Sequence, residues 1–253
     1  MGFFDLLSPV FTAIQTYALS WLPAWAIVSL YGLLSGILTM VIYTKVSNQD
    51  ALSAGKLESK ESLTLMRELD PDAEFDVVIA TMRRAIGAPL KQAKNSLVPA
   101  LWASLPLIFV MVWLDHTYGY HEPEAGSIVQ AHIEPLVPLQ EALGIQRNED
   151  DSYSLTWPET GQIDLVAQNG DNITSIPSTM RVPVLHKRQW WNILIANPAG
   201  YLEEDAPIEA IQLTLPATEI VSFGPGWLRS WLFFYFAILM SAAIAIKVKF
   251  KIA

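Results

Sequence analysis

The twenty residues from Trp25 to Thr44, WAIVSLYGLLSGILTMVIYT, contain no charged side chain. The charge-free stretch around them extends from just after Asp5 to just before Lys45. A bilayer core about 30 Å thick needs roughly 20 helical residues at about 1.5 Å each. This stretch therefore predicts a membrane-spanning helix over residues 25–44, with enough chain before it for a separate segment.

Two further stretches have the same character. Twenty uncharged residues lie from Asn95 to Leu114, and seventeen lie from Ser230 to Ile246. They predict spans over residues 98–115 and 226–246. Tryptophan, which favours the ends of membrane spans, occurs near the expected ends as Trp21, Trp25, Trp113, Trp227 and Trp231. Three buried core helices of a soluble protein are the alternative, but a small chain cannot easily bury three such runs without lipid.

Residues 1–22 form a candidate interfacial helix. Apolar residues recur at helical spacing, with polar residues between them: Phe4, Leu7, Phe11, Ile14, Ala18 and Trp21. The first charge is Asp5, whereas a signal peptide begins with basic residues. We expect an amphipathic helix on the outer leaflet, turned at Pro23 into the first span.

The distribution of charge predicts the orientation. Residues 45–95 carry eight basic and eight acidic side chains, whereas residues 115–222 carry four basic and sixteen acidic ones. The tail, residues 247–253, adds three lysines and no acid. Lysine and arginine concentrate on the cytoplasmic side. We expect a multi-pass protein of the cell inner (plasma) membrane with its N-terminus outside and its C-terminus in the cytoplasm.

The cytoplasmic segment, residues 45–96, has the pattern of a helical hairpin. Asp70 is a good helix N-cap and Pro71 a good first helical residue. Gly87 and Pro89 should bend the chain before the second span. An apolar stripe on the second helix should pack on one from the first, the two comprising Phe75, Val78, Ile79, Met82 and Ile86, and Leu52, Leu63, Met66 and Leu69. The hairpin is either purely structural or a docking surface for a ribosome, translocon, nascent chain or partner.

Residues 116–223 change to a β-rich pattern. Asn169-Gly170 is a hairpin signal, and a short helix is expected around residues 139–143. Short apolar runs between turns predict strands at 152–157, 162–167, 181–185, 190–195, 208–215 and 219–223. The fold class is therefore a polytopic α-helical membrane protein: three transmembrane helices, a cytoplasmic helical hairpin and an extracytoplasmic antiparallel β-sandwich-like domain.

The composition excludes several classes of function. With no cysteine there is no disulfide or thiolate site, and a net charge of −9 disfavours nucleic acid. The hydrolase, metalloprotease, phosphate-loop and dinucleotide motifs do not occur. His116 and His121 lie near carboxylates, but their spacing matches no metal motif. We predict no enzyme, no cofactor and no metal.

Within the spans the polar residues are small and uncharged. The groove-lining candidates are Ser29, Ser35, Thr39, Ser104 and Ser241. One interpretation is close helix packing, which the Gly32-Leu33-Leu34-Ser35-Gly36 motif favours. The other is a mildly polar, partly wet surface inside the membrane. The sequence leaves both open.

Three sequence motifs, together with the order in which they occur, indicate a resemblance to a known family. They are VIYTKVSNQ at residues 41–49, the stretch from Met82 to Leu114 that leads into WLDHTY at 113–118, and FGPGWLRSW at 223–231. With the expected topology, the chain resembles the Oxa/YidC superfamily of membrane protein insertases. In these motifs the sequence looks most like the archaeal YidC-like proteins and the third subunit of the endoplasmic-reticulum membrane complex.

The resemblance implies a membrane protein insertase or intramembrane chaperone. Client segments would pass through a groove formed by the three helices. The implied partners are the lipid bilayer and membrane protein clients or other membrane subunits. The alternative is a non-catalytic scaffold or assembly subunit of a larger membrane complex, which would bind a partner through the outer domain. Its contact candidates are Trp157, Trp190 and Trp191, because aromatic residues often supply binding hot spots.

Overall fold

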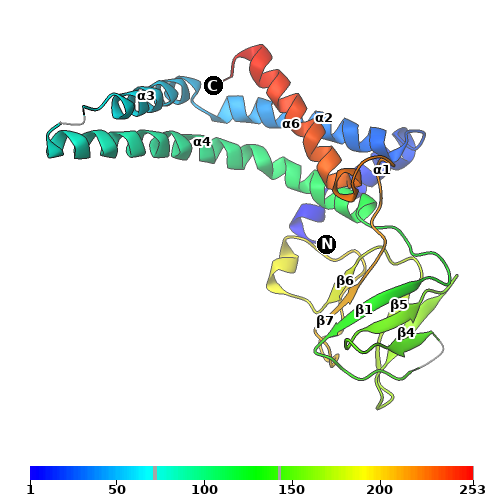
Figure 1. Ribbon diagram of the computed structural model, residues 1–253. Helices are drawn as coiled ribbons and strands as arrows, with labels where there is room; N and C mark the ends of the chain where they lie inside the picture. The colour runs from blue at the N-terminus through cyan, green and yellow to red at the C-terminus, as the bar shows by residue number, and fades with distance from the viewer. Residues whose placement is uncertain (71–72, 142–143, 253) are drawn as a thin grey trace. The chain divides into compact units, whose positions relative to one another are not determined.

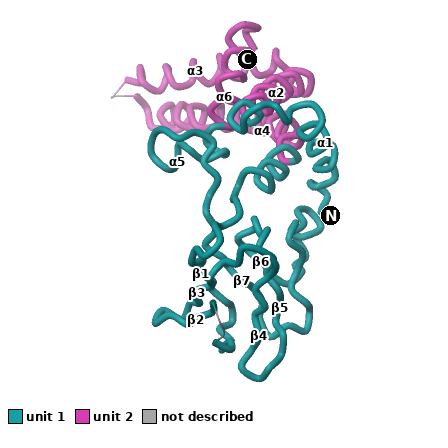
Figure 2. The backbone as a smooth tube through the Cα atoms, turned by 90° about the vertical axis from the view of Figure 1, so that its right-hand side faces the viewer, with its two compact units in different colours: residues 1–28, 109–234 teal, residues 29–108, 235–253 magenta. Residues whose placement is uncertain are grey.

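The computed structural model describes residues 1–70, 73–141 and 144–252. The chain forms two compact units (Figure 2). Unit 1 comprises Met1–Val28 and Phe109–Phe234, and unit 2 comprises Ser29–Ile108 and Tyr235–Ala253. Unit 1 holds the β-rich domain with the N-terminal segment, and unit 2 holds most of the long helices.

Three helices in the described part of the chain are long and apolar enough to cross a membrane. They are α2 (Ala24–Val46), α4 (Phe75–Tyr118) and α6 (Trp231–Phe250) (Figure 1). The prediction of three long apolar helices is confirmed, and α2 covers the whole of the expected span at residues 25–44.

The second span is not a separate helix. The sequence predicts a bend at Gly87 and Pro89, but α4 continues from Phe75 to Tyr118 through Pro89, Pro99 and Pro106. Each proline removes one backbone N–H, yet long helices absorb such losses where neighbouring turns remain bonded. Residues 98–115 are therefore the last part of a helix that begins within the expected hairpin.

The third long apolar helix, α6, begins later than the predicted span at residues 226–246. A short helix, α5 (Gly226–Arg229), ends at Ser230, whose backbone is extended with ψ of 145°. Ser230 pairs with Glu219 in an isolated bridge, and the Arg229 guanidinium bonds the Glu219 carboxylate at 2.9 Å. These contacts hold residues 226–230 outside α6, which extends to Phe250 and so includes Lys247 and Lys249 of the expected tail.

The connection between the hairpin helices also differs from the prediction. Helix α3 (Gln49–Arg67) is capped by Asn48, whose side chain accepts a hydrogen bond from the Ala51 N–H at 3.0 Å. Asp70 does not cap the next helix, because α4 begins only at Phe75. Pro71 and Asp72 lie outside the described residues.

The β-rich domain contains two antiparallel sheets. A five-stranded sheet in the described part has the order β2-β3-β1-β7-β6, and β4 (Gln162–Val166) pairs separately with β5 (Asn172–Pro177). The strands of the larger sheet are β1 (Ile128–Glu134), β2 (Ile145–Arg147), β3 (Tyr153–Thr156), β6 (Val184–His186) and β7 (Ala210–Leu213). Side chains from both sheets share one core, which includes Val129, Leu155, Leu165, Ile176 and Ile211.

Several local predictions are wrong. Residues 190–195 form a 3-10 turn, η2 (Trp190–Ile193), because Gln189 and Asn192 bond each other locally and compete with strand pairing. Residues 219–223 make only the isolated bridge at Glu219. Leu139 pairs with Ala167 instead of starting a helix, and residues 142–143 lie outside the described chain. Three observed strands, β1, β2 and β5, lie outside all of the predicted strand ranges.

Candidate functional site

Small residues bring α2 and α6 together, as the glycine motif predicts. A Cβ added at Gly36 would lie 2.7 Å from the Leu239 carbonyl oxygen and 2.8 Å from the Ala242 Cβ. One added at Gly32 would lie 3.0 Å from the Tyr235 carbonyl oxygen. The backbones can approach this closely only because both positions lack a side chain.

Ser35 belongs to this helix contact. Its hydroxyl accepts a hydrogen bond from the buried Tyr235 hydroxyl at 2.8 Å, and both side chains are almost fully buried. Ser35 was a groove-lining candidate in the sequence, whereas nothing in the sequence indicated its partner Tyr235. The packing interpretation of the small residues in α2 therefore holds at Gly32, Ser35 and Gly36.

The other groove candidates do not gather around a shared polar space. Thr39 donates to the Ser35 carbonyl at 2.7 Å, Ser104 to the Leu101 carbonyl at 2.8 Å, and Ser241 to the Ala237 carbonyl at 2.7 Å. Ser29 is half-buried on α2, and Ser241 is exposed on α6. A hydroxyl bonded within its own helix needs no partner from water, so these residues are compatible with an apolar surrounding.

The hairpin helices pack through small residues rather than through the expected apolar stripes. Helix α3 buries Ser59 and Ser62, and Gly55 lies against Gln92 of α4. A Lys91–Glu58 ion pair at 3.6 Å also joins the helices. On the face of α4 that carries Gln92, Ala85 and Ala88 are buried. Small side chains allow the close approach, so most of the larger apolar ones face outward.

The predicted apolar stripes are mostly exposed. Of their nine residues, Leu52 is buried, Val78 and Leu69 are half-buried, and six are exposed: Leu63, Met66, Phe75, Ile79, Met82 and Ile86.

The exposed apolar stripe of α4 continues beyond Ile86, where the stripe predicted from the sequence ended. We call it the α4 track, which consists of Phe75, Ile79, Met82, Ile86, Leu90, Leu97 and Leu101. Its residues recur every three or four positions, except that Ala93 takes the place between Leu90 and Leu97, and so they share one helix face. Phe75 is 77% exposed, and Leu101 is 57% exposed. Ser104 continues the same face. An exposed apolar surface thus extends along one face of α4 from Phe75 to Leu101.

The N-terminal segment packs beside the end of α4 through both aromatic and polar side chains. It comprises η1 (Phe3–Asp5) and α1 (Ser8–Ala18). Thr12 accepts a hydrogen bond from the Trp113 indole at 3.1 Å, and the Gln15 amide donates to the Tyr118 hydroxyl at 3.1 Å. The Phe4 ring meets the Phe109 ring at 5.2 Å. The expected apolar face is divided: Phe4 and Phe11 make ring contacts with α4, whereas the other four residues are exposed, namely Leu7, Ile14, Ala18 and Trp21.

Asp5 ties this segment to a loop of the β-rich domain. Its side chain is almost fully buried and accepts hydrogen bonds from the Gly2 N–H at 2.9 Å and the Ala196 N–H at 2.7 Å. The His116 ring lies 3.7 Å away. A lone acid in an apolar N-terminus was the signal for this junction, but from the sequence Asp5 was interpreted only as the limit of the charge-free stretch and as evidence against a signal peptide.

The three tryptophan candidates have different environments. Trp157 is a core residue, with its indole donating to the Ser178 carbonyl at 2.9 Å, so it is not available to a partner. Trp190 is 81% exposed. Trp191 is partly exposed and packs against the His186 ring at 4.9 Å. The structure therefore keeps Trp190 and Trp191 as contact candidates and removes Trp157.

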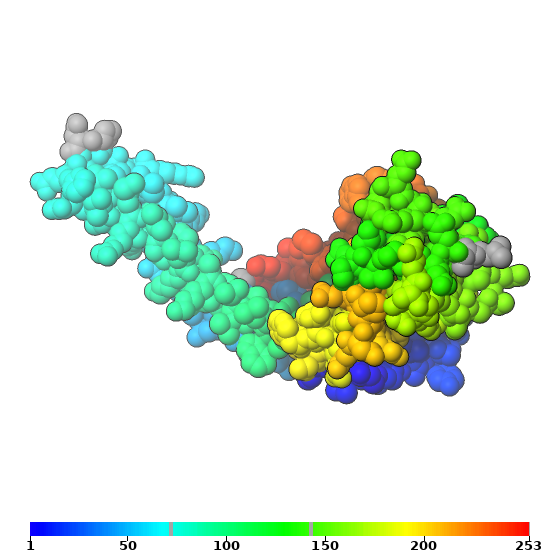
Figure 3. All heavy atoms as spheres, turned by 90° about the horizontal axis from the view of Figure 1, so that it is seen from below, coloured from blue at the N-terminus to red at the C-terminus, as the bar shows by residue number. Residues whose placement is uncertain are grey.

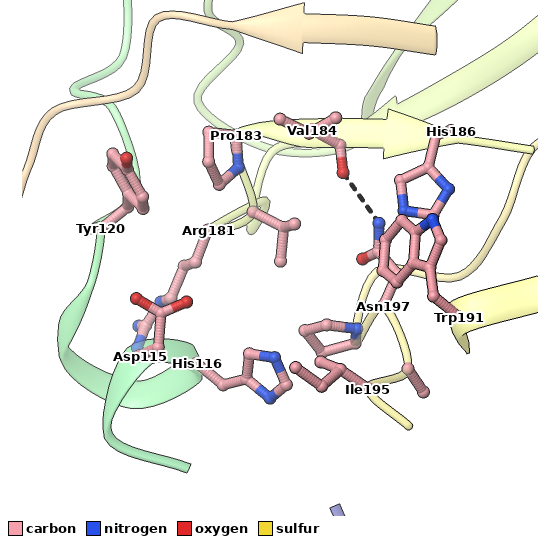
Figure 4. A pocket seen from close by; sticks show the side chains of 13 residues that line it. Asp115, His116, Tyr120, Arg181, Pro183, Val184, His186, Trp191, Ile195 and Asn197 are labelled. Atoms are coloured by element: carbon pink, nitrogen blue, oxygen red, sulfur yellow. Dashed lines mark hydrogen bonds between the residues drawn. The ribbon is translucent and has the colours of Figure 1, made fainter. Parts of the chain in front are cut away.

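A pocket of about 370 Å³ lies in unit 1, beside the loop that contains Trp191 and Ile195 (Figure 4). Asp115, His116 and Tyr120 line one side, while Trp191 and Ile195 line the other. Two of its polar groups have partners, because Arg181 bonds Glu122 at 2.9 Å and His116 faces Asp5, while the Asp115 carboxyl also lines the pocket. The Asn197 amide bonds the Val184 carbonyl at 2.7 Å. The remaining lining is mainly apolar, so the pocket suits an apolar guest better than an ion.

No group of three or more His, Asp or Glu side chains among the residues that the structure describes is placed to hold an ion. Comparison of the chain with protein-family models, with curated proteins and with solved structures gave no match.

Proposed function

We propose that this protein is a membrane protein insertase or intramembrane chaperone of the Oxa/YidC type. The observation that carries the proposal is the α4 track, an exposed apolar surface that begins on the hairpin and continues into the apolar part of the helix. An apolar client segment in water gains about 25 cal/mol for each Å² that it buries. A continuous track lets the segment keep that contact as it moves toward lipid.

The composition of the track suits varied clients. It combines aromatic, branched and flexible side chains, and Met82 adapts its shape to different partners. Arg83 and Lys94 lie near it and are exposed. The groove is correspondingly less polar than the sequence suggested, since Ser35 is used in packing and Ser104 bonds its own helix.

Client contact can be tested by cross-linking, because the chain has no native cysteine. Ile86→Cys and Leu101→Cys are each expected to cross-link to a single cysteine in the apolar segment of a nascent client. Arg84→Cys is the matched control, since it is exposed on another face of α4. Equal cross-linking at all three positions, or at none, would remove the track as the client surface.

Activity gives a second test. In proteoliposomes, the Ile86→Ser/Leu90→Ser variant is expected to insert a single-span client several-fold more slowly than the unaltered protein. Both side chains are exposed, so the folded state should lose little stability. Ile128→Ser, an exposed apolar position in the β-rich domain, is the control. If the unaltered protein inserts clients no faster than empty liposomes, the insertase proposal is wrong.

The proposal requires the hairpin to face the cytoplasm and the β-rich domain to lie outside. In intact cells, a cysteine in place of exposed Lys60 should be protected from a membrane-impermeant thiol reagent, whereas one in place of exposed Gln168 should react. After the cells are opened, both should react. Labelling of the Lys60 position alone in intact cells would invert the orientation.

A scaffold subunit is the second candidate, and the exposed Trp190 favours it. Gentle detergent extraction separates the two candidates. A stoichiometric co-purifying membrane subunit would support the scaffold, whereas association with ribosomes or a translocon would support the insertase.

A further inference from the structure

The loop of residues 187–196 exposes a run of large apolar side chains. Trp190 and Ile193 are 81% and 70% exposed, and Trp191, Leu194 and Ile195 are exposed to a smaller degree. Soluble domains seldom present so many neighbouring apolar groups to water unless the surface contacts a partner or a membrane. Figure 3 shows the yellow atoms of this region at the molecular surface.

Two hydrogen bonds join the loop to the N-terminal segment. The Phe4 N–H donates to the Leu194 carbonyl at 2.8 Å, and the Ala196 N–H donates to the Asp5 carboxylate. The N-terminal segment itself exposes Phe3, Leu6 and Val10. The loop and this segment therefore present apolar side chains side by side, next to the end of a helix that is apolar enough to cross a membrane.

The charge at the start of the loop points to the chemistry of its partner. Residues 115–222 contain four basic side chains among sixteen acidic ones, and two of the four, Lys187 and Arg188, immediately precede the apolar run. A basic pair followed by tryptophan and aliphatic residues fits an anionic membrane surface, with lysine and arginine at the headgroups and tryptophan at the interface.

We infer that the 187–196 loop inserts its apolar side chains into the outer leaflet of an anionic bilayer, with Lys187 and Arg188 at the headgroups. This inference rests on the part of the proposed function in which the long helices span a membrane. Lipid fits better than a protein partner, because the loop is hydrogen-bonded to a segment that itself exposes large apolar side chains beside the end of a helix apolar enough to cross a membrane. The loop thereby fixes the outer domain to the membrane surface.

The test places an environment-sensitive fluorophore on a cysteine at Ile193 in the full chain, reconstituted in phosphatidylglycerol-rich vesicles. The emission is expected to shift to the blue, and quenchers on the lipid acyl chains near the headgroup should reduce it, because interfacial groups lie about 5–10 Å into the leaflet. A cysteine at Gln168, in the β4–β5 turn, is the matched control and should show neither effect.

A charge variant tests the headgroup contact. Lys187→Gln/Arg188→Gln should weaken lipid quenching at position 193, by a factor of about five for each charge, and vesicles of phosphatidylcholine should have a similar effect. Circular dichroism checks that the variant remains folded. A water-exposed fluorophore at 193, or one that is shielded but not quenched by lipid, would overturn the inference, and the second result would indicate a protein partner. Resistance of the chain to alkaline extraction from vesicles shows separately whether the helices span the membrane.

Discussion

Replacing Gly36 by alanine should lower the free energy of unfolding by about 1–3 kcal/mol, the usual effect of forcing a methyl group into a filled space. The added Cβ would lie 2.7 Å from a backbone oxygen of α6, which cannot move aside as a flexible side chain would. Replacing Gly32 as well should raise the loss to on the order of 2–6 kcal/mol, because the two methyl groups press on successive turns of α6. Unfolding in detergent micelles, followed by circular dichroism, measures both.

The same substitution at Gly87 provides the control. Gly87 also lies inside a long helix, but a Cβ there would meet no atom within 4 Å. Gly87→Ala should therefore stabilise the protein by roughly 0.5–1 kcal/mol, the ordinary gain of alanine over glycine in a helix. Equal effects at positions 36 and 87 would show that α2 and α6 do not approach as closely as described.

The second large effect is expected at Asp5. Asp5→Ala leaves the Gly2 and Ala196 N–H groups without their buried acceptor, at a cost of about 1–3 kcal/mol for each. The 190–197 segment should then open far more often, and its amide hydrogens should exchange about tenfold faster for each 1.4 kcal/mol lost. Hydrogen exchange followed by mass spectrometry resolves this segment from the rest of the domain.

Glu124→Ala is the control for Asp5, because Glu124 is an exposed carboxylate of the same unit. It should leave exchange in the loop unchanged. Asp5→Asn keeps one carbonyl acceptor and should have an intermediate effect. Unchanged exchange at Ala196 in Asp5→Ala would mean that the N-terminal segment does not hold the loop.

The sequence predicted the long apolar helices well because their signal is the absence of charge over a fixed length. That signal needs no knowledge of neighbours. The β-rich character of residues 116–223 was also evident from short runs and turns, and the Asn169-Gly170 turn does join β4 to β5. The sequence did not predict strand β1, because the nearby Pro123, Pro135 and Pro138 favoured an extended or short helical segment there. The strand's buried positions alternate only in the folded chain.

Periodicity alone could not show what surrounds each face of a helix. A stripe such as Phe75, Ile79 and Met82 shows that these residues share a face, but not whether protein, lipid or water covers it. The hairpin packs through Gly55, Ser59 and Ala85, whose small size matters more than their polarity. Tyr235 was missed for a related reason, since only the folded chain brings it to Ser35.

The exposed apolar side chains of α1, among them Val10 and Ile14, have a consequence for the surroundings in which this helix can dock. In water, each large apolar side chain left exposed forgoes about 1.5–3 kcal/mol of transfer free energy, so α1 has little reason to adopt its observed orientation there. In a bilayer the same side chains would be in their preferred solvent. The hydrogen bond that Thr12 accepts from Trp113, and the one that Gln15 donates to Tyr118, could then select the register along α4. If α4 spans a membrane, we therefore expect the N-terminal helix to dock onto it only after α4 has reached the bilayer.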